Sequence, residues 1–518
     1  MCFGFHKEVY VIKGSDKNAL LLGENISTHD ASRKHSDVKR LVIFLIEEDD
    51  DEKKTYEKAS HFGGIVKVLD RKNNFEFYMK KARLGKWSGR NKKYNVILMP
   101  NSTSISDDAH LVVEYAKGKN VKPERLDIFA FTLSEWERER IETTSQAKEG
   151  ENRKYPYTFH IINEVDLLVR LMLENHPPYE CVGLGLKNGV ATRDFTVLII
   201  GFGAVGQNAL LRLIMNGQFV GSRMHAIIID RDIEHLHEHF MHCHPSLNLC
   251  CDMDFRSINV RDEVFFKLLR ENHEVDYIVA AINDDELNKQ TAMDIRLHYE
   301  RNNIALPFIA VLEGNRCLHE VKQDREIFVC GHQEETYKES IIIREKTDLM
   351  AKTISDTYKE IYGGNSWYEH DWFSQESNRA SADFIPAMLK LAQLKKDDVI
   401  NKDVLTEDSE LAEILAQTEH LRWMAFHAAM GYRPISIEEM RQRFKYNGNK
   451  NPLEYSRRCS EKRLHVCLAS WDELDGISAA YRELERRAGK EPKRDFKEND
   501  RDIIKYIPKF IRAAKGGE

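Results

Sequence analysis

The chain has 518 residues, of which 42% are hydrophobic and 31% are charged, and its formal net charge is -7. At roughly 150 residues per domain, this length predicts three domains rather than one core. The mild charge is spread over interspersed acidic and basic residues, so we expect no direct nucleic-acid binding. No stretch of the sequence approaches the roughly 20 apolar residues that span a bilayer.

The nine cysteines are odd in number and scattered along the sequence. No secretory leader precedes them. We therefore expect free thiols and a protein of the reducing cytoplasm. The sequence leaves open whether the protein works without a membrane module or has been separated from one.

The first part of the chain alternates short apolar runs with stretches that can form amphipathic helices. The candidate strands are Glu8–Ile12, Leu41–Ile46, Gly64–Leu69, Asn95–Met99 and Leu126–Phe131. The candidate helices between them include Asn18–Ile26 and Ser106–Gly118. Near-continuous apolar strands that alternate with helices predict a doubly wound parallel sheet covered on both faces.

A polar stretch at about 143–154 follows and is typical of a linker. Apolar residues then recur at helical spacing over Ile161–Leu173, so we expect a connecting helix there. Pro177 and Pro178 end this helix, because proline cannot continue it.

A second alternating region begins with the apolar run Thr196–Ile200. Its further candidate strands are His225–Asp230, Tyr277–Ile282 and Leu306–Val311. Strand signals vanish after about Ile341, and helices are predicted at Asn378–Leu391, Asp408–Met430 and Asp500–Arg512. The predicted fold class is therefore α/β, with two tandem parallel-sheet domains followed by an all-helical domain.

A glycine-rich turn follows the first strand of the second region. Its residues are Gly201, Phe202, Gly203, Ala204, Val205 and Gly206, in the pattern G-x-G-x-x-G. The first glycine permits a tight turn, the second lets the backbone approach a pyrophosphate, and the third allows close helix packing. The amides and the dipole of the following helix would hold the anion. This pattern predicts a Rossmann-type dinucleotide site.

Asp230 ends the next candidate strand, where a carboxylate can accept hydrogen bonds from the hydroxyls of an adenosine ribose. Its charge would repel a 2′-phosphate, so NAD or another adenine nucleotide is favoured over NADP, although the adjacent Arg231 weakens this preference. The alternative is a Rossmann fold that keeps its glycines for packing and binds nothing.

Asn283, Asp284 and Asp285 follow the strand Tyr277–Ile282, at the carboxyl edge where ligands lie in such folds. They are further candidates for cofactor binding. Helix capping by Asn or Asp explains the same residues equally well.

The first region has one glycine, Gly14, at the turn where the second region has three. We interpret it as a degenerate Rossmann-like domain that serves as a structural or dimerising copy, although Gly14 and Ser15 would suffice for a small anion. The predicted domains are 1–142 (degenerate), 143–195 (linker and connecting helix), 196–340 (nucleotide-binding) and 341–518 (helical).

Histidines and cysteines crowd the stretch after Asp230. They are His235, His237, His239, His242, Cys243, His244, Cys250 and Cys251. Their spacing is irregular and contains no paired C-x-x-C, so we expect a solvated histidine-rich face and no metal. No nucleophile elbow, Walker loop, kinase signature or H-E-x-x-H motif occurs, and no histidine stands out for proton transfer, so no catalytic residue is predicted.

The second region resembles the TrkA-N domain, also called the RCK domain. The match rests on Gly201, Gly203, Gly206 and Asp230, and on the acidic turn at 283–287. Domains of this kind bind NAD(H) or other nucleotides and gate potassium channels and transporters. The resemblance implies a regulatory nucleotide site, a homodimer or higher homo-oligomer, and a membrane or effector partner.

The helical region resembles the RyR domain, which is repeated in ryanodine receptors and present in bacterial proteins. The matching pieces are Asn378–Ala382, Glu419–Trp423, Gly431–Arg433, His465–Leu474 and Asn499–Asp502. Together the two resemblances imply a bacterial TrkA-N/RyR protein. Some such proteins are proposed to sense nucleotide signals in antiviral defence.

The candidate ligand residues of this RyR-like region are Asn378, Arg379, Glu419, Arg422, Trp423 and Trp471. Residues three and four apart share a helix face, and an arginine beside aromatic rings suits a phosphate and a purine. The alternative is an internal Glu–Arg pair with a buried tryptophan that holds the helices together, and for Trp423 we prefer this alternative.

These features predict a nucleotide-binding sensor or regulator rather than a catalyst, in antiviral signalling or ion-transport regulation. The opposing hypothesis is an NAD-dependent oxidoreductase in which the helical region caps the substrate. A third hypothesis is a scaffold that binds no nucleotide.

Overall fold

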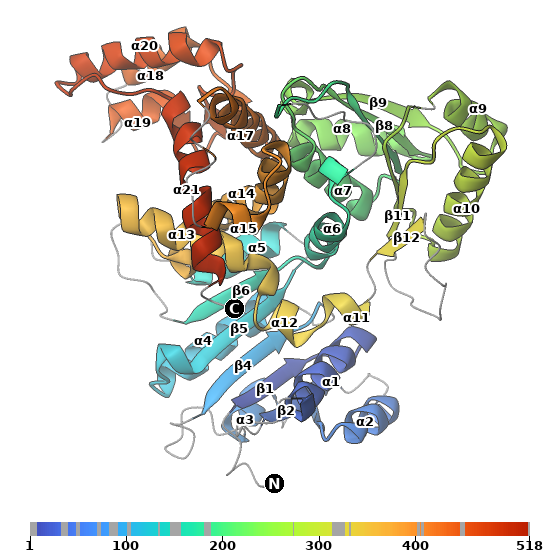
Figure 1. Ribbon diagram of the computed structural model, residues 1–518. Coiled ribbons are helices and arrows are strands. Elements are labelled where there is room, and N and C mark those ends of the chain that lie inside the picture. Colours follow the sequence, from blue (N-terminus) through green and yellow to red (C-terminus); the bar gives the residue numbers. More distant parts are fainter. Residues whose placement is uncertain are drawn as a thin grey trace. The chain divides into compact units, whose positions relative to one another are not determined.

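The computed structural model describes residues 8–32, 40–47, 52–69, 74–81, 92–100, 105–132, 135–145, 157–180, 188–272, 274–312, 327–330, 333–400, 405, 409–445 and 451–515. The chain divides into two compact units, each assembled from three separate segments (Figure 1). Unit 1 comprises Met1–Leu168, His332–Asp348 and Tyr358–Gln375, and unit 2 comprises Val169–Gly331, Leu349–Thr357 and Glu376–Glu518. Across the described residues, no helix has both the length and the apolar character needed to cross a membrane.

Unit 1 is built on a six-stranded parallel sheet with the order β3-β2-β1-β4-β5-β6. Its strands are β1 (Glu8–Lys13), β2 (Arg40–Glu47), β3 (Ile65–Leu69), β4 (Lys93–Leu98), β5 (Leu126–Phe131) and β6 (Thr158–Ile162). Its helices after the strands are α1 (Lys17–Ser32), α2 (Glu52–His61), α3 (Phe75–Lys81), α4 (Ile105–Gly118) and α5 (Glu135–Ser145). The order steps outward from β1 in both directions, as in doubly wound folds.

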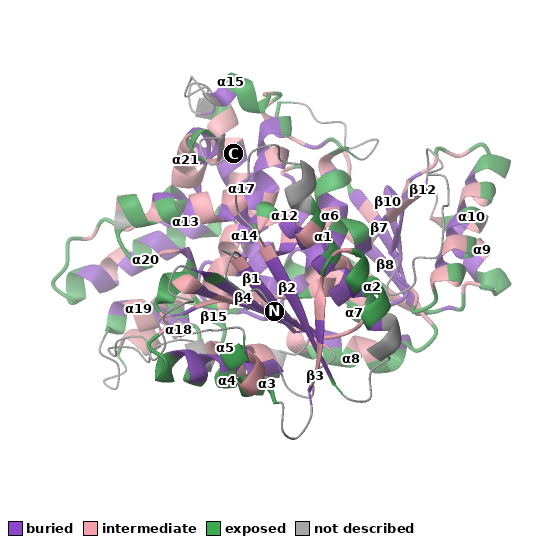
Figure 2. Cartoon of the chain, turned by 90° about the horizontal axis from the view of Figure 1, so that it is seen from below, coloured by how far each residue is buried: buried purple, intermediate pink, exposed green. Residues whose placement is uncertain are grey.

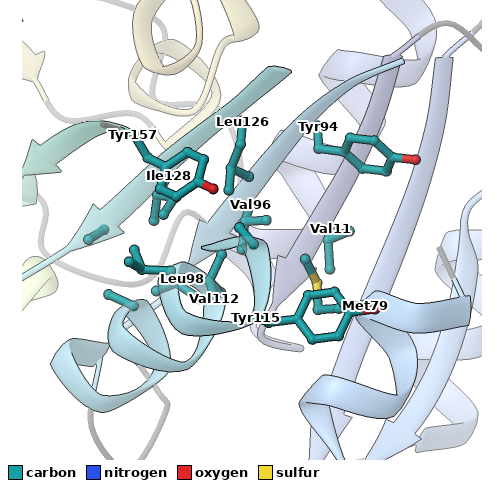
Figure 3. Close-up of a cluster of buried hydrophobic side chains, with 14 of the residues drawn as sticks. Val11, Met79, Tyr94, Val96, Leu98, Val112, Tyr115, Leu126, Ile128 and Tyr157 are labelled. Carbon is teal, nitrogen blue, oxygen red and sulfur yellow. The ribbon is translucent and has the colours of Figure 1, made fainter. Parts of the chain in front are cut away.

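Apolar side chains fill the space between this sheet and α4 (Figure 3). Val11, Val96 and Ile128 come from three adjacent strands, and Val112 comes from the helix. Figure 2 shows that the strands of this sheet are largely buried. The strands are apolar on both faces because helices cover both faces of a doubly wound sheet.

Unit 2 contains a second six-stranded parallel sheet, with the order β12-β11-β10-β7-β8-β9. Its strands are β7 (Phe195–Ile200), β8 (Met224–Asp230), β9 (Cys251–Ser257), β10 (Tyr277–Ala280), β11 (Phe308–Leu312) and β12 (Ile327–Cys330). Its helices are α7 (Ala204–Asn216), α8 (Ile233–Cys243), α9 (Glu263–Glu271) and α10 (Asp285–Arg301). Each sheet therefore has its first strand at the centre, between the second and the fourth.

The rest of the chain is mainly helical. Its helices are α6 (Glu164–Asn175), α11 (Gln333–Thr336), α12 (Glu339–Ile342), α13 (Leu349–Tyr362), α14 (Trp372–Leu391), α15 (Lys396–Ile400), α17 (Ser409–Ala429), α18 (Ile437–Phe444), α19 (Pro452–Arg457), α20 (Glu473–Arg487) and α21 (Lys497–Lys515). Short 3-10 helices are η2 (Pro123–Arg125), η3 (Pro178–Glu180), η4 (Leu247–Leu249), η5 (Lys346–Asp348) and η6 (Trp367–Glu369). A small sheet joins β13 (Arg433–Pro434), β15 (Leu464–His465) and β14 (Arg458–Cys459).

The predicted fold class is confirmed, since two parallel α/β sheets precede a helical C-terminal region. The expected helix over Ile161–Leu173 is wrong at its start, because Ile161 and Ile162 belong to strand β6 and α6 begins at Glu164. The small sheet β13–β15 and the edge strands β9 and β12 are additions that the sequence did not indicate. Residues 146–156, most of the predicted linker, lie outside the described residues.

Candidate functional site

The glycine-rich turn connects β7 to α7 at the carboxyl edge of the second sheet. Gly201 has a φ of +88°, and a Cβ built on it would lie 2.7 Å from the backbone carbonyl of Ala281. A Cβ built on Gly206 would lie 1.9 Å from the carbonyl oxygen of Gly201. Side chains are excluded at both positions, so packing alone requires these two glycines.

Gly203 has a different environment. It caps α7 with a φ of -70°, and a Cβ built on it would meet no atom within 4 Å. Gly203 and Ala204 are exposed, and α7 has no acidic residue in its first turn. The first amides of a helix have no intrahelical acceptor and lie at the positive end of the dipole, so the exposed start of α7 can attract an anion.

Asp230 fastens the turn to the end of β8. Its Oδ2 accepts a hydrogen bond from the amide of Phe202 at 2.7 Å, and its Oδ1 accepts one from the amide of Asp232 at 2.9 Å. A carboxylate oxygen can accept a second hydrogen bond, so the half-buried Asp230 keeps acceptor capacity for ribose hydroxyls. Arg231 is exposed and pairs with Asp232 at 3.2 Å.

The side chain of Phe202 belongs to the interior. It is fully buried and lies edge-on against Phe240 and Phe255, with ring centroids 5.0 Å and 5.5 Å away. Among the residues of the turn, Phe202 can therefore offer a ligand only its backbone. Gln207 was not predicted as a site residue, and its Nε2 donates to the carbonyl of Phe202 at 3.0 Å, which braces the turn.

Two side chains that follow β10 form hydrogen bonds with backbone groups. Asp284 caps α10 by accepting from the amide of Leu287 at 3.0 Å, which is the helix-capping alternative. Asn283 is exposed and Asp285 is half-buried, so the sheet edge keeps polar groups near solvent. Asn288, which the sequence analysis missed, is fully buried and binds both backbone groups of Ile282 at 2.7 Å and 2.8 Å.

The candidate residues on α17 form an internal ion pair. Arg422 Nε donates to Glu419 Oε2 at 2.8 Å and Arg422 Nη2 donates to Oε1 at 2.7 Å, with both side chains buried. Ser381 on α14 donates to the same carboxylate at 3.5 Å. The internal Glu–Arg alternative is therefore the one observed.

Arg379 is also held inside the protein, by Glu376 on the same helix at 2.6 Å. Glu376 also accepts from Arg212 on α7, at 2.5 Å. Burial alone would raise the pKa of Glu376, but these arginines together with Arg170 hold it well below its ordinary value. Asn378, the neighbouring candidate, is half-buried.

Trp423 and Trp471 are partly exposed, and both rings lie close to the buried His420. Their ring centroids are 5.9 Å and 5.7 Å from the imidazole, and the ring of Trp423 is nearly parallel to it. Lys497 and Arg501 lie over the ring of Trp471, at 5.1 Å and 5.9 Å. The helical C-terminal region thus exposes parts of two indoles beside two cations that are paired with Asp475 and Glu413, whereas its predicted arginines are internal.

The first part of the histidine-rich stretch, from His235 to Cys243, lies on helix α8. Cys243 contacts His239 at 3.7 Å, and the thiols of Cys250 and Cys251 are buried. Burial raises the pKa of Cys250 to about 12 and also raises that of Cys251, so both stay protonated. No trio of His, Cys, Asp or Glu within the described part of the chain is arranged to hold a metal ion.

Comparisons with known proteins give no relatives for this site. No protein-family model matches the chain, and no curated protein matches it.

Proposed function

We propose that this protein is a regulator that binds an adenine nucleotide, or a dinucleotide such as NAD, at the Gly201–Gly206 turn. The observation that carries the proposal is the open space at Gly203. Packing explains the glycines on either side of it, but it gives no reason for a glycine at the cap of α7. A phosphate that approaches the backbone of this turn gives one.

The preference for NAD over NADP follows from Asp230 and Arg231. The carboxylate of Asp230 would bind ribose hydroxyls and repel a 2′-phosphate. Arg231 is bound to Asp232 at the surface, so its charge is already compensated there. We therefore propose an unphosphorylated adenosine ribose beside β8.

We propose a regulatory role rather than hydride transfer because the polar side chains after β10 serve structure. Asp284 caps a helix and Asn288 binds strand backbone, so neither is placed as a proton donor for a substrate. Binding would act by favouring one of two arrangements of the protein. Assembly into a homodimer and coupling to a membrane or effector partner are part of the same proposal.

A second nucleotide site is proposed in the RyR-like region, at Trp423 and Trp471. Indoles can stack on a purine. Lys497 and Arg501 lie over the ring of Trp471, but they are already paired with Asp475 at 2.8 Å and with Glu413 at 2.9 Å, so the two indoles carry this proposal. Arg422 and Glu419 would support this surface from inside rather than contact the ligand.

Thermal shift with NAD, NADH, ADP-ribose, ATP and cyclic oligonucleotides tests the proposal on wild type, Gly203→Arg and Trp471→Ala. A ligand at 100 times its Kd stabilises the folded state by about 2.7 kcal/mol. We expect Gly203→Arg to abolish the shift for the ligand of the α/β site and Trp471→Ala to spare it. Equal stabilisation of wild type and Gly203→Arg by every ligand would rule out the turn as a site, and turnover of NADH with a substrate would favour the oxidoreductase.

A further inference from the structure

In each of the two parallel sheets, an equivalent set of backbone hydrogen bonds fixes the turn after the first strand. In unit 1 the amide of Gly14 donates to the carbonyl of Leu45 at 3.0 Å, and in unit 2 the amide of Gly201 donates to that of Ile229 at 2.9 Å. A second matching bond ties the loop after the fourth strand to the first strand, from Met99 to Lys13 and from Ala281 to Ile200. Gly14 therefore occupies the position of Gly201, and the following residues can be matched one by one.

The position of Gly203 is occupied by Asp16 in the first domain. Asp16 Oδ1 accepts a hydrogen bond from the amide of Ala19 at 2.8 Å and so caps α1. The first domain thus places its own carboxylate at the helix N-terminus. In the second domain this is the open position proposed for the phosphate.

A second acid reinforces this negative charge. Glu164 Oε1 accepts from the buried Asn18, in the first turn of α1, at 3.1 Å. Burial and the neighbouring charge of Asp16 raise the pKa of Glu164, so the two carboxylates repel each other. A phosphate entering here would meet two acidic groups at a helix end that has already been capped.

The space beside Glu164 is filled by the chain itself. Tyr337, which follows α11, is fully buried and stacks on Phe131 at the end of β5, with ring centroids 5.7 Å apart. Burial and the charge of Glu164 raise the pKa of Tyr337, so the phenol stays neutral. This edge of the sheet has therefore been packed as protein interior.

The first domain has no carboxylate at the position of Asp230, and Glu47, which ends β2 one residue further along, pairs with Lys13 at 3.3 Å. Because Leu45 matches Ile229, the residue that matches Asp230 is Ile46, which is buried and apolar. An isoleucine accepts no hydrogen bond from a ribose hydroxyl.

We infer that Asp16 closes the nucleotide position of the first domain, so that the chain carries a single Rossmann-type nucleotide site, at Gly203. The identity of one residue, two positions after the first glycine of the turn, separates the closed domain from the open one. This inference rests on the proposed function of the second domain.

Moving the acid from one domain to the other tests the role of Asp16. Gly203→Asp installs the arrangement of the first domain in the second, and Gly203→Asn adds a cap of the same size without charge. We expect equilibrium dialysis with labelled ADP-ribose to show at least 100-fold weaker binding in Gly203→Asp and an intermediate loss in Gly203→Asn, at unchanged melting temperature. Undiminished binding by Gly203→Asp would overturn the inference, because a capping carboxylate would then be compatible with the phosphate.

Photolabelling of the full chain with 8-azido-ADP-ribose tests the number of α/β sites. We expect labelled peptides to come from residues 196–260 and none from residues 8–47. Label in both ranges would refute the closure of the first domain and leave the proposed function standing. Label in neither range would contradict the proposed function and with it the single site at Gly203, but not the closure of the first domain.

Discussion

A methyl group added to the glycines of the β7–α7 turn would have different consequences at Gly206 and at Gly203. At Gly206 it would overlap the carbonyl of Gly201, whereas at Gly203 it would enter open space. The backbone of Gly203 also has a φ that alanine adopts readily. Folding therefore requires glycine at Gly206, whereas at Gly203 the fold also accommodates a small side chain.

We predict that Gly206→Ala lowers the free energy of unfolding by about 3 kcal/mol or more, because the clash is with backbone that cannot move aside. Gly203→Ala should change it by less than about 1 kcal/mol, since a slightly poorer cap is offset by a stiffer unfolded chain. Urea unfolding of both variants measures the difference. Equal losses of unfolding free energy would show that a side chain at position 203 also clashes with neighbouring atoms.

His427 links the stability of the helical region to pH. Burial lowers its pKa to about 3, and the charge of Arg422 acts in the same direction, although a hydrogen bond to the carbonyl of Trp423 opposes it. Between pH 6.5 and about pH 3, His427 is therefore protonated in the unfolded state and neutral in the folded state. Its contribution is constant above that pH and turns unfavourable as the pH falls towards 3.

We predict that unfolding free energy falls by about 1.4 kcal/mol per pH unit from this residue between about pH 5.5 and pH 4. His427→Gln keeps a donor for the carbonyl of Trp423 but cannot take up a proton. Denaturation at a series of pH values should show a slope smaller by one proton in this variant. A slope identical to wild type would contradict the pKa assignment.

The sequence indicated the candidate site residues but not the groups that these residues bind in the structure. The glycine pattern and a strand ending in Asp230 indicate where a nucleotide would lie. Whether Arg422 faces a ligand or Glu419 depends on which side of α17 is buried, which a helical repeat alone does not decide. The role of Asp16 required the register of two strands.

At the scale of elements, α7 connects the glycine-rich turn to helix α14. Its first residues form the turn, and Arg212 near its other end is bound to Glu376 on α14. Arg170 binds Asp383 on the same helix through two hydrogen bonds, at 2.9 Å and 3.0 Å. A displacement of α7 on ligand binding would therefore reach α14 through buried charges.

We predict that Glu376→Met destabilises the protein by about 3–5 kcal/mol, because it leaves Arg212 and Arg379 buried without their shared carboxylate. Adding Arg212→Met should recover part of this loss. Glu271→Gln, which removes an exposed pair with Lys267, serves as the matched control and should change stability by less than about 0.5 kcal/mol. Chemical denaturation measures all three, and additive losses in the double variant would refute the coupling.

Apart from the edge strand β3, the strands found from sequence are central strands that are buried on both faces. The missed strands β6, β9 and β12 are the last strands on their sides of the two sheets. β9 has the sequence CDMDFRS, in which charged residues break the apolar run. An edge strand pairs on one side only and faces solvent more, so its sequence carries a weaker signal.

At the scale of the whole molecule, neither unit is a continuous piece of chain. Unit 1 needs His332–Asp348 and Tyr358–Gln375 in addition to its first segment. The buried Glu339 of α12 pairs with Arg40 at 3.0 Å, and Tyr337 fills the edge of the sheet. The first domain therefore depends on residues far along the sequence.

We predict that a fragment of residues 1–175 is not stably folded, because it leaves Arg40 and the edge near Phe131 without their partners. Circular dichroism melts and dye binding should show a broad transition and exposed apolar surface. Co-expression with residues 332–375 should restore cooperative melting. A sharp transition of the fragment alone would refute this dependence.

Because a side chain fits at Gly203, the residues that replace it under different kinds of selection should differ. In a laboratory population that drifts under selection for folding alone, Gly201 and Gly206 should persist, since most replacements unfold the chain. Gly203 should accumulate other residues in that population. Selection for nucleotide binding should instead keep glycine at position 203. The number of different residues found at this position would therefore show whether the population depends on a bound ligand.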